Sequence, residues 1–578
     1  MSPRVAGSLL MAFTLLAGFG VQGDSRPVEG WCPTATQVRV ATAPAGLAAH
    51  REVADAFEQW VTDRSDGCRL VDLYLYPVVA ERMTTAIRDG WAQGDDPDHR
   101  PLRDIGPHPD LWLPERGTDV PVEEAGLAGV LAETVKVAET PIVLGVPVDQ
   151  ATGLDPDGRD ATRTWSELFA EVNAAAPGGT GVIRGDPAVS ATALMATVKL
   201  YRDGEIEPGE ARTTVERWIE RTLDSGGYPP GDEDGLLCRQ REIRRASRNA
   251  PLAAVVLTEQ ALIRYNTGLP SAAPCVQEGR PSEADRLVAF YPTDAPVVDQ
   301  NVVRLRWADR FQSANGRAYG RLFVRWLQSG SGPDALLRAG ARPPGRVFQR
   351  LQDGPNGILG NWPFSQVAEG EPDPDTLRAV ADVYAEARRP GRFLVALDAS
   401  GSMGAATADP TRTRFEVSVA AVQAAVARMG GRDEFGLLTF SGSGRRSVRE
   451  VLPISPRPAG GEAVGQATEG IRPTGGTPLY EGVRRGSGML RKEPTSEQLR
   501  VLVVVTDGQD TSGQSMPTTA ETAGVRVFVI GVGEGTCDVT AVKRLVSSTT
   551  GRCFDASLAS LERTLNEMFG VIWDSEEG

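Results

Sequence analysis

Apolar and polar positions alternate with two different periods in the first part of the chain. Residues 38–44 and 69–77 alternate in the manner of strands, whereas residues 46–63 and 80–91 place apolar side chains along one face of a helix. This strand–helix alternation continues to about Arg342. It predicts an open, largely parallel sheet covered by helices, with ligands held near the carboxyl ends of the strands.

The last third of the chain has a different pattern, in which the strands are almost continuously apolar. RFLVALDAS, EFGLLTF, LRVLVVVTDG and VRVFVIGVG are of this kind, as expected for strands buried on both faces of a parallel sheet. The helix after the first of them has an apolar face made of Phe415, Val419, Val422, Val426 and Met429. We therefore expect a doubly wound α/β domain in this part of the chain.

A stretch rich in Pro, Gly, Asn and Asp, residues 343–374, separates the two patterns and indicates a boundary. The chain of 578 residues is long enough for several domain-sized units. The expected organisation is a signal peptide at 1–23, a first domain at 36–343, a linker and connecting helix at 344–390, and a second domain at 391–574.

The first residues have the features of a secretory signal peptide. Arg4 supplies the positive charge, an apolar run extends from about Leu9 to Phe19, and small residues lead to Gly23. The run is short for a membrane span of roughly 20 residues, so an uncleaved anchor is the second interpretation. The protein is expected to be secreted or cell-surface, with membrane association only if this segment is retained.

Composition and charge exclude several functions. The formal net charge is −15 and no basic run with interleaved aromatics occurs, so a nucleic-acid partner is not expected. His50, His99 and His108 are too few and too clustered for a zinc site or a catalytic triad with the C-terminal residues. No phosphate-binding Gly-Lys-Ser/Thr loop and no acid/base carboxylate pair is recognisable, so an enzyme is not expected.

The six cysteines fall into three couples that are local in sequence, which suits disulfides in an oxidising compartment. The couples are Cys32 with Cys68, Cys238 with Cys275, and Cys537 with Cys553. Buried free thiols are the alternative for each couple.

Several phrases of the first domain occur in an order that resembles bacterial extracellular solute-binding proteins of the two-lobed periplasmic type. They are PDLWLPERG from Pro109, ETPIVLGVP from Glu139, TWSELFAE from Thr164, GDPAVSATAL from Gly185, VVLTEQALIRYN from Val255 and VAFYPTDAP from Val288. The resemblance implies two α/β lobes that close over a small molecule in a cleft.

Candidate cleft residues follow from position alone, and a purely structural role is the alternative for each: Ala43, Pro44, Trp112, Glu115, Tyr291 and Thr293. Ser190 and Thr192 are expected at a helix N-terminus, where they could cap the helix or help to attract an anion or carboxylate. The charged segment 202–249 has the character of a family-specific insertion, so the ligand could be of any class or absent.

Oxygen side chains gather after the strands of the second domain. Asp398, Ser400 and Ser402 follow the first strand, Thr477 begins a helix in TGGTPLYEG, and Asp507 follows VLVVVT. Hydroxyls with one or two carboxylates form an incomplete oxygen shell of the kind that Mg²⁺ accepts. The sequence therefore predicts a metal site with an open coordination position.

These five residues, in this order, resemble the metal-ion-dependent adhesion site of the von Willebrand factor type A domain. The resemblance implies a Rossmann-like fold, bound Mg²⁺ or Mn²⁺, and a protein partner that offers an acidic side chain to the metal. The turn Asp510–Ser512 is expected to be a polar turn that could tune this contact. A motif kept for folding alone, or a metal used only within the chain, is the alternative interpretation.

Three functions remain open. The first is an exported, non-enzymatic binding protein with a metal-dependent recognition domain and a solute-binding-like domain. The second is the solute-binding component of an ABC-type transport system. The third is an accessory subunit of a metal chelatase, which the expected export disfavours because chelatase partners are cytosolic ATPases.

Overall fold

The computed structural model describes most of the two expected domains. The described residues are 32–556 except 92–100, 155–162, 177–179, 202–207, 229–231, 270–278, 308–311, 345–355, 359–369, 408–410, 430–432, 443–446, 457–461, 493–497, 533–535 and the single positions 123, 128, 152, 189, 227, 389, 428 and 550. The predicted signal peptide therefore lies outside the described residues, as does the end of the second predicted domain, 557–574. Within the described part of the chain, no helix is long and apolar enough to cross a membrane.

The N-terminal domain is built on one mixed sheet with the strand order β2-β1-β3-β8-β4-β6-β5, and β7 pairs with β4. The pairs β1–β2, β1–β3 and β5–β6 are parallel, whereas β3–β8, β4–β8, β4–β6 and β4–β7 are antiparallel. The prediction of a largely parallel sheet is therefore wrong for this domain, because β4 and β8 run in opposite directions through its middle. The strands are β1 Thr36–Thr42, β2 Val71–Pro77, β3 Leu111–Leu113, β4 Leu131–Pro147, β5 Val182–Ile183, β6 Ala254–Thr258, β7 Leu287–Phe290 and β8 Val297–Leu305.

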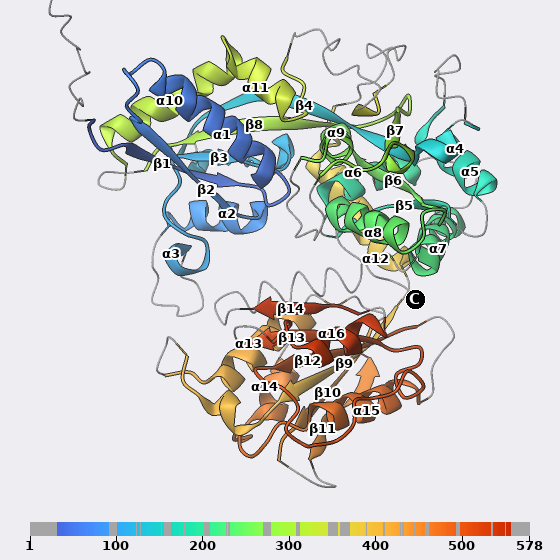
Figure 1. Ribbon diagram of the computed structural model, residues 1–578. Helices are drawn as coiled ribbons and strands as arrows, with labels where there is room; N and C mark the ends of the chain where they lie inside the picture. The colour runs from blue at the N-terminus through green and yellow to red at the C-terminus, as the bar shows by residue number, and fades with distance from the viewer. Residues whose placement is uncertain are drawn as a thin grey trace, which may run out of the picture.

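Strands β4 and β8 connect two lobes (Figure 1). The first half of β4 pairs with β8, and its second half pairs with β6 and β7 in the second lobe. Each lobe has its own apolar core, so the predicted two-lobed α/β architecture is confirmed. The first lobe contains α1 Leu47–Thr62, α2 Ala80–Arg88, α3 Pro101–Asp104, η1 Gly117–Asp119, η2 Ala125–Leu127, α10 Ala314–Gln328 and α11 Gly332–Arg338; the second contains α4 Val148–Ala151, α5 Trp165–Ala175, α6 Ala191–Leu200, α7 Pro208–Gly226, α8 Glu233–Ala246, α9 Glu259–Thr267 and η4 Glu283–Asp285.

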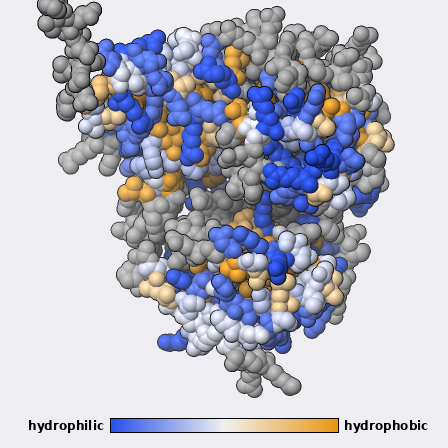
Figure 2. Space-filling view, in the orientation of Figure 1, coloured by the Kyte–Doolittle hydropathy of each residue, from blue (hydrophilic) through white to orange (hydrophobic). Residues whose placement is uncertain are grey.

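Local sequence signals explain where several of these helices begin and end. Thr164 accepts a hydrogen bond from the backbone N–H of Glu167, whose side chain accepts one from Thr164 in return, and this capping box starts α5. Helix α9 ends at Gly268, whose φ of 73° lies in the left-handed region that glycine adopts without strain. Figure 2 shows hydrophilic atoms gathered over α8, whose apolar face packs toward β6.

The C-terminal domain is the predicted doubly wound sheet, with strand order β11-β10-β9-β12-β13-β14. Every pair is parallel except β10–β11. Alternate residues of β9 face opposite cores, Phe393 and Val395 on one side, Leu394 and Ala396 on the other. The elements are β9 Gly391–Asp398, η9 Gly401–Gly404, α13 Arg414–Ala427, β10 Glu434–Phe440, β11 Val448–Pro456, α14 Glu462–Thr468, α15 Leu479–Leu490, β12 Leu499–Thr506, β13 Arg526–Val532, α16 Thr540–Ser547 and β14 Cys553–Ala556.

The connecting helix is part of the folded structure rather than a free linker. Helix α12, Pro374–Ala387, packs on α6 and α7 of the second lobe, on the side nearest the C-terminal domain (Figure 1). Just before it, the Glu371 carboxylate accepts hydrogen bonds of 2.8 to 2.9 Å from the backbone N–H groups of Gly117, Thr118 and Asp299. Just after it, Arg388 pairs with Asp433 of the C-terminal domain at 2.9 Å. Residues 371–388 therefore contact both lobes of the N-terminal domain and also the C-terminal domain.

The structure contains two of the predicted disulfides in full, Cys32–Cys68 and Cys537–Cys553. Cys238 is also disulfide-bonded, but its predicted partner Cys275 lies outside the described residues. The alternative of buried free thiols is wrong for the five described cysteines, none of which is free. The cysteine pattern therefore indicated covalent links correctly.

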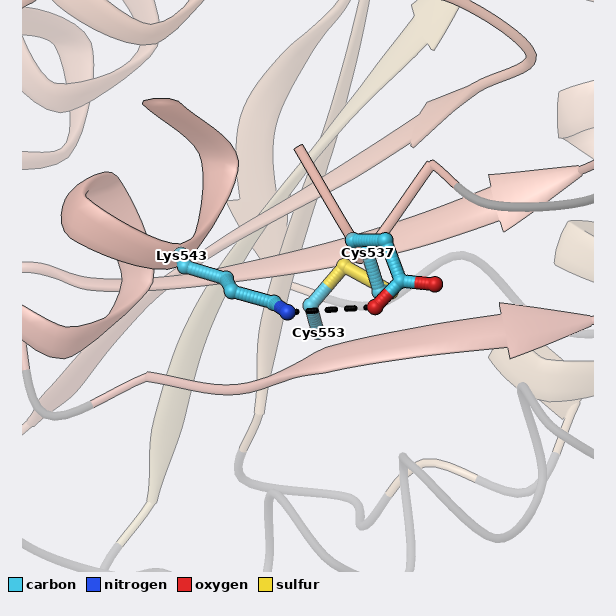
Figure 3. The surroundings of a disulfide bond; sticks show 4 residues. Cys537, Lys543 and Cys553 are labelled. Atoms are coloured by element: carbon cyan, nitrogen blue, oxygen red, sulfur yellow. Dashed lines mark hydrogen bonds and ion pairs between the residues drawn. A yellow bond between two sulfur atoms is a disulfide. The ribbon is translucent and has the colours of Figure 1, made fainter. Parts of the chain in front are cut away.

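Removing the Cys537–Cys553 bridge is expected to destabilise the C-terminal domain by about 3 kcal/mol. The bridge closes a loop with a sequence separation of 16 between the turn before α16 and the start of β14 (Figure 3), and the open loop gains entropy in the unfolded chain. The measurement is thermal unfolding of a Cys537→Ser/Cys553→Ser variant in the full chain.

The matched control is Lys543→Gln, which breaks the neighbouring exposed ion pair of 3.1 Å to Asp538 (Figure 3). An exposed ion pair contributes little to the free energy of unfolding. The control should therefore unfold with a free energy within about 0.5 kcal/mol of that of the parent. A cysteine variant as stable as the control would show that the loop is held by packing alone.

Candidate metal site and cleft

The first metal-ligand candidates lie where β9 ends and η9 begins. The Asp398 side chain is fully buried at the end of β9, where its Oδ1 accepts a 2.8 Å bond from the Ser400 N–H and its Oδ2 accepts a 2.5 Å bond from the Thr506 hydroxyl. Burial, with a smaller contribution from Asp507, raises the pKa of Asp398 to about 6. This carboxylate is therefore held in a fixed orientation by two hydrogen bonds from neutral donors.

Asp507 lies beside this group because β12 is the parallel neighbour of β9 and ends at the same edge of the sheet. The Ser402 hydroxyl donates a 2.7 Å bond to Asp507 Oδ1, and the Ser400 and Ser402 hydroxyl oxygens lie 3.1 Å apart. Asp507 Oδ2 accepts a 2.7 Å bond from Arg414 Nη1 at the start of α13. The loop after β9, which carries Ser402, is therefore in direct contact with the loop after β12, which carries Asp507.

The loop that carries Thr477 is fastened to both of the other loops. Gly401 N–H donates to the Gly475 carbonyl at 3.0 Å, in a turn where Gly475 has a φ of 77°. Thr477 N–H donates to the Thr511 hydroxyl at 2.7 Å, and Thr511 N–H donates to the Thr477 carbonyl at 2.9 Å. Asp510 accepts a 3.0 Å bond from the N–H of Tyr480, in the first turn of α15. The Asp510–Ser512 turn therefore positions Thr477, a role that its sequence did not indicate.

All five predicted residues thus belong to three loops that meet at one edge of the sheet. Two carboxylates and three hydroxyls form an oxygen-only donor set, which fits Mg²⁺ or Mn²⁺. No group of three His, Cys, Asp or Glu side chains that could hold a metal occurs among the described residues, and this site contains only two such side chains. Arg414, which contacts Asp507, was not predicted from the sequence, because one arginine at a helix start has no distinguishing pattern.

A cavity of about 850 Å³ lies between the two lobes of the N-terminal domain. Ala43, Gly46, His50 and Glu115 line it from the first lobe. The second lobe contributes residues of α6, α8 and α9, and the crossing strands contribute Thr140, Val298 and Gln300. The cavity has the position of the predicted cleft and a volume suited to a small molecule.

The predicted cleft residues divide into correct and incorrect ones. Ala43 and Glu115 line the cavity, whereas Pro44 and Thr293 are not among the lining residues. The prediction is wrong for Trp112 and Tyr291: the Trp112 ring is fully buried in a core of the first lobe, and Tyr291 donates to the buried Glu259 carboxylate in the second.

The helix N-terminus predicted from Ser190 and Thr192 is present. Ser190 caps α6 through a 3.0 Å bond from Ala193 N–H to its hydroxyl, and Thr192 lines the cavity. In the charged segment 202–249, α7 packs on β5 and α8 packs on β6. The segment also supplies Asp232, Glu233 and Asp234 to the cavity wall.

Comparison with protein families identifies the C-terminal domain. Residues 393–509 match the family model for the von Willebrand factor type A domain. The chain contains a von Willebrand factor type A domain. The matched residues include all five predicted metal ligands and Arg414. No match to the chain was found among curated proteins.

Solved structures give likenesses at low identity. The VWA domain of SpRpn10 has 14% identity and a TM-score of 0.24, with 30% of this chain and 95% of that chain covered. A von Willebrand factor type A protein from Catenulispora acidiphila has 18% identity and a TM-score of 0.26, with 32% and 42% covered, so this chain spans less than half of that protein. A periplasmic thiamin binding protein has 12% identity and a TM-score of 0.37, with 62% of this chain and 99% of that chain covered.

The formal charges of Asp398, Asp507 and Arg414 determine the net charge at the loops where the five predicted ligands meet. Asp398 and Asp507 carry two negative charges, and Arg414 adds one positive charge at 2.7 Å from Asp507. A divalent ion held there would leave one formal positive charge in all, whereas without Arg414 the sum would be zero. Arg414 therefore makes this group of side chains one unit less negative than its two carboxylates alone.

Proposed function

We propose that this chain is an exported, non-enzymatic binding protein whose type A domain binds a protein partner through Mg²⁺ or Mn²⁺. Asp398, Ser400, Ser402, Thr477 and Asp507 hold the metal, and an acidic side chain of the partner completes its shell. The observation that supports this proposal most strongly is that these five residues lie on three loops at one sheet edge. There the Ser402 hydroxyl donates to Asp507, and the backbone N–H of Thr477 donates to the Thr511 hydroxyl.

The N-terminal domain, in this proposal, binds a small molecule between its lobes. The cavity of about 850 Å³ with walls from both lobes supports this part. The same observation favours the second candidate function, in which the chain delivers a solute to an ABC-type transporter and the type A domain docks it. The disulfides support an oxidising, extracytoplasmic location for either function.

Peptides selected from a random display library by the immobilised full chain in Mg²⁺, and eluted by a chelator, are expected to contain Asp or Glu. Replacing that residue by its amide should weaken binding at least about tenfold, since it removes a charged ligand of the metal. Asp507→Asn in the chain should abolish capture. The measurement is the affinity of the selected peptides, with and without chelator.

The controls separate the metal from the surrounding surface. Glu481→Gln changes a partly exposed carboxylate in the first turn of α15 and should leave capture unchanged. Arg414→Gln removes the guanidinium charge and should weaken the acidic peptides while Mg²⁺ binding persists. Peptides that bind equally well in the presence of chelator would contradict the proposed function.

A further inference from the structure

The cavity between the lobes has an acidic wall built from both sides. Glu115 follows β3 in the first lobe, while Asp232 and Glu233 stand at the start of α8 in the second. The wall is coupled across the cleft, because the charge of Asp232 acts on Glu115 and the charge of Glu115 acts on Glu233. Three carboxyl groups of two lobes thus line one cavity.

The hydrogen bonds that Glu115 and Glu233 accept come from neutral donors. Glu233 accepts a 3.1 Å bond from the Ser190 hydroxyl and also bonds to the Thr192 hydroxyl, and Glu115 accepts a bond from the backbone N–H of Ala191. These groups form the N-terminus of α6, so the anion predicted for this helix end is supplied by the chain itself. Positive charge reaches the acidic wall from outside the cavity lining: Arg116, which pairs with Asp119 at 2.6 Å, acts on Glu115, and Arg552 and Asp232 act on each other.

The cationic side chains of the cavity wall are engaged elsewhere. Arg264 pairs with Glu52 at 2.8 Å. Arg241 donates to the carbonyls of Gly279 and Tyr265 and lies 4.7 Å from the centre of the Tyr265 ring. Burial, followed by the charge of Arg264, lowers the pKa of His50 to about 4, so His50 is neutral at pH 7.

The pKa values of Glu115 and Glu233 are both raised, as expected for carboxyl groups that are buried close to other carboxyl groups. Burial, followed by the charge of Asp119, raises the pKa of Glu115 to about 7. Burial, followed by the charge of Asp232, raises the pKa of Glu233 to about 7. Carboxyl groups with raised pKa values are stabilised in the charged form when a cation comes close.

We propose that the cavity binds an organic cation, with its ammonium or guanidinium group held by Glu115 of one lobe and Glu233 of the other. This inference rests on the part of the proposed function that assigns a small molecule to the cleft. An organic cation fits better than a bare metal ion, since the wall forms no group of three metal-ligating side chains among the described residues and the cavity is far larger than one ion. The cation joins the lobes because each supplies one carboxylate.

The experiment is calorimetric titration of the full chain with three cations, cadaverine, agmatine and choline, each beside a neutral analogue of the same size in which a hydroxyl or carbon replaces the charged group. Glutarate is the anionic probe. The variants are Glu115→Gln and Glu233→Gln, which keep the side-chain shape. The control is Glu242→Gln, which changes a carboxylate of the same α8 that does not line the cavity.

The expected result is saturable binding of at least one cation, with no binding of its neutral analogue or of glutarate. Each cavity variant should weaken that binding at least about tenfold, and the control should change it less than about twofold. Binding of a neutral or anionic probe in preference to the cations overturns the inference but leaves the small-molecule part of the proposed function standing. Absence of binding by every probe overturns the inference.

Discussion

Asp398→Asn is expected to lower the affinity of the full chain for Mg²⁺ at least about a hundredfold, equivalent to about 2.7 kcal/mol. Asp398 is one of only two carboxylates among the five proposed ligands, and an amide oxygen carries no charge with which to hold a hard cation. Asparagine keeps the shape of the side chain: its Oδ1 can still accept the bond from the Ser400 N–H, and its amide nitrogen can donate to the Thr506 hydroxyl in place of the bond that Thr506 donates to Asp398. Titration calorimetry with Mg²⁺ and Mn²⁺ measures the effect.

A second measurement shows whether the variant is folded. At a concentration one hundred times its Kd, a ligand that binds only the folded state stabilises that state by about 2.7 kcal/mol. Mg²⁺ should therefore raise the melting temperature of the type A domain in the parent and in Glu481→Gln, but not in Asp398→Asn. Saturable Mg²⁺ binding by a folded Asp398→Asn variant would show that the metal is held elsewhere.

Arg184→Met is expected to destabilise the N-terminal domain by about 3 to 5 kcal/mol. Arg184, which directly follows β5, forms a 2.7 Å ion pair with Glu216 of α7. Their side chains are only 2% and 3% exposed. Methionine has a comparable volume but leaves the Glu216 charge buried without its cation. The melting temperature of the N-terminal transition measures the loss.

Two further variants make this prediction specific. The double variant Arg184→Met/Glu216→Leu removes both charges and should recover most of the lost stability. Arg378→Met breaks an ion pair on α12 with Asp375 in which both partners are exposed, at 75% and 85%, so it should cost less than about 0.5 kcal/mol. If Arg184→Met and Arg378→Met cost the same, burial does not determine the strength of the first pair.

The sequence allowed the type A domain to be predicted in some detail, because buried parallel strands leave a strong signal. A strand such as LVVVT in β12 has no polar face, and the oxygen ligands stand directly after such strands. Arg414 was missed because its role comes only from the approach of α13 to Asp507 in space. Thr511 and Asp510 were recognised as a turn, but their bonds to the Thr477 loop cross between segments that are distant in sequence.

The N-terminal domain was less predictable, for two physical reasons. Apolar periodicity shows that a segment is a strand but not its direction, so the antiparallel course of β4 and β8 was not visible. Position after a strand also does not determine where a side chain points: Trp112 and Glu115 are three residues apart, yet one is in a core and the other lines the cavity. Glu233 went unnoticed because it stands in a charged segment without a motif.

The place of β9 in its sheet has a mechanical consequence. The chain enters β9 from α12 by way of Arg388, which pairs with Asp433, and leaves it at Asp398 of the proposed metal site. A partner that pulls on the metal while the N-terminal domain is held would therefore stretch the molecule along this strand. Because β9 is paired over its length with both β10 and β12, such tension would shear two hydrogen-bonded ladders at the same time instead of peeling one bond after another.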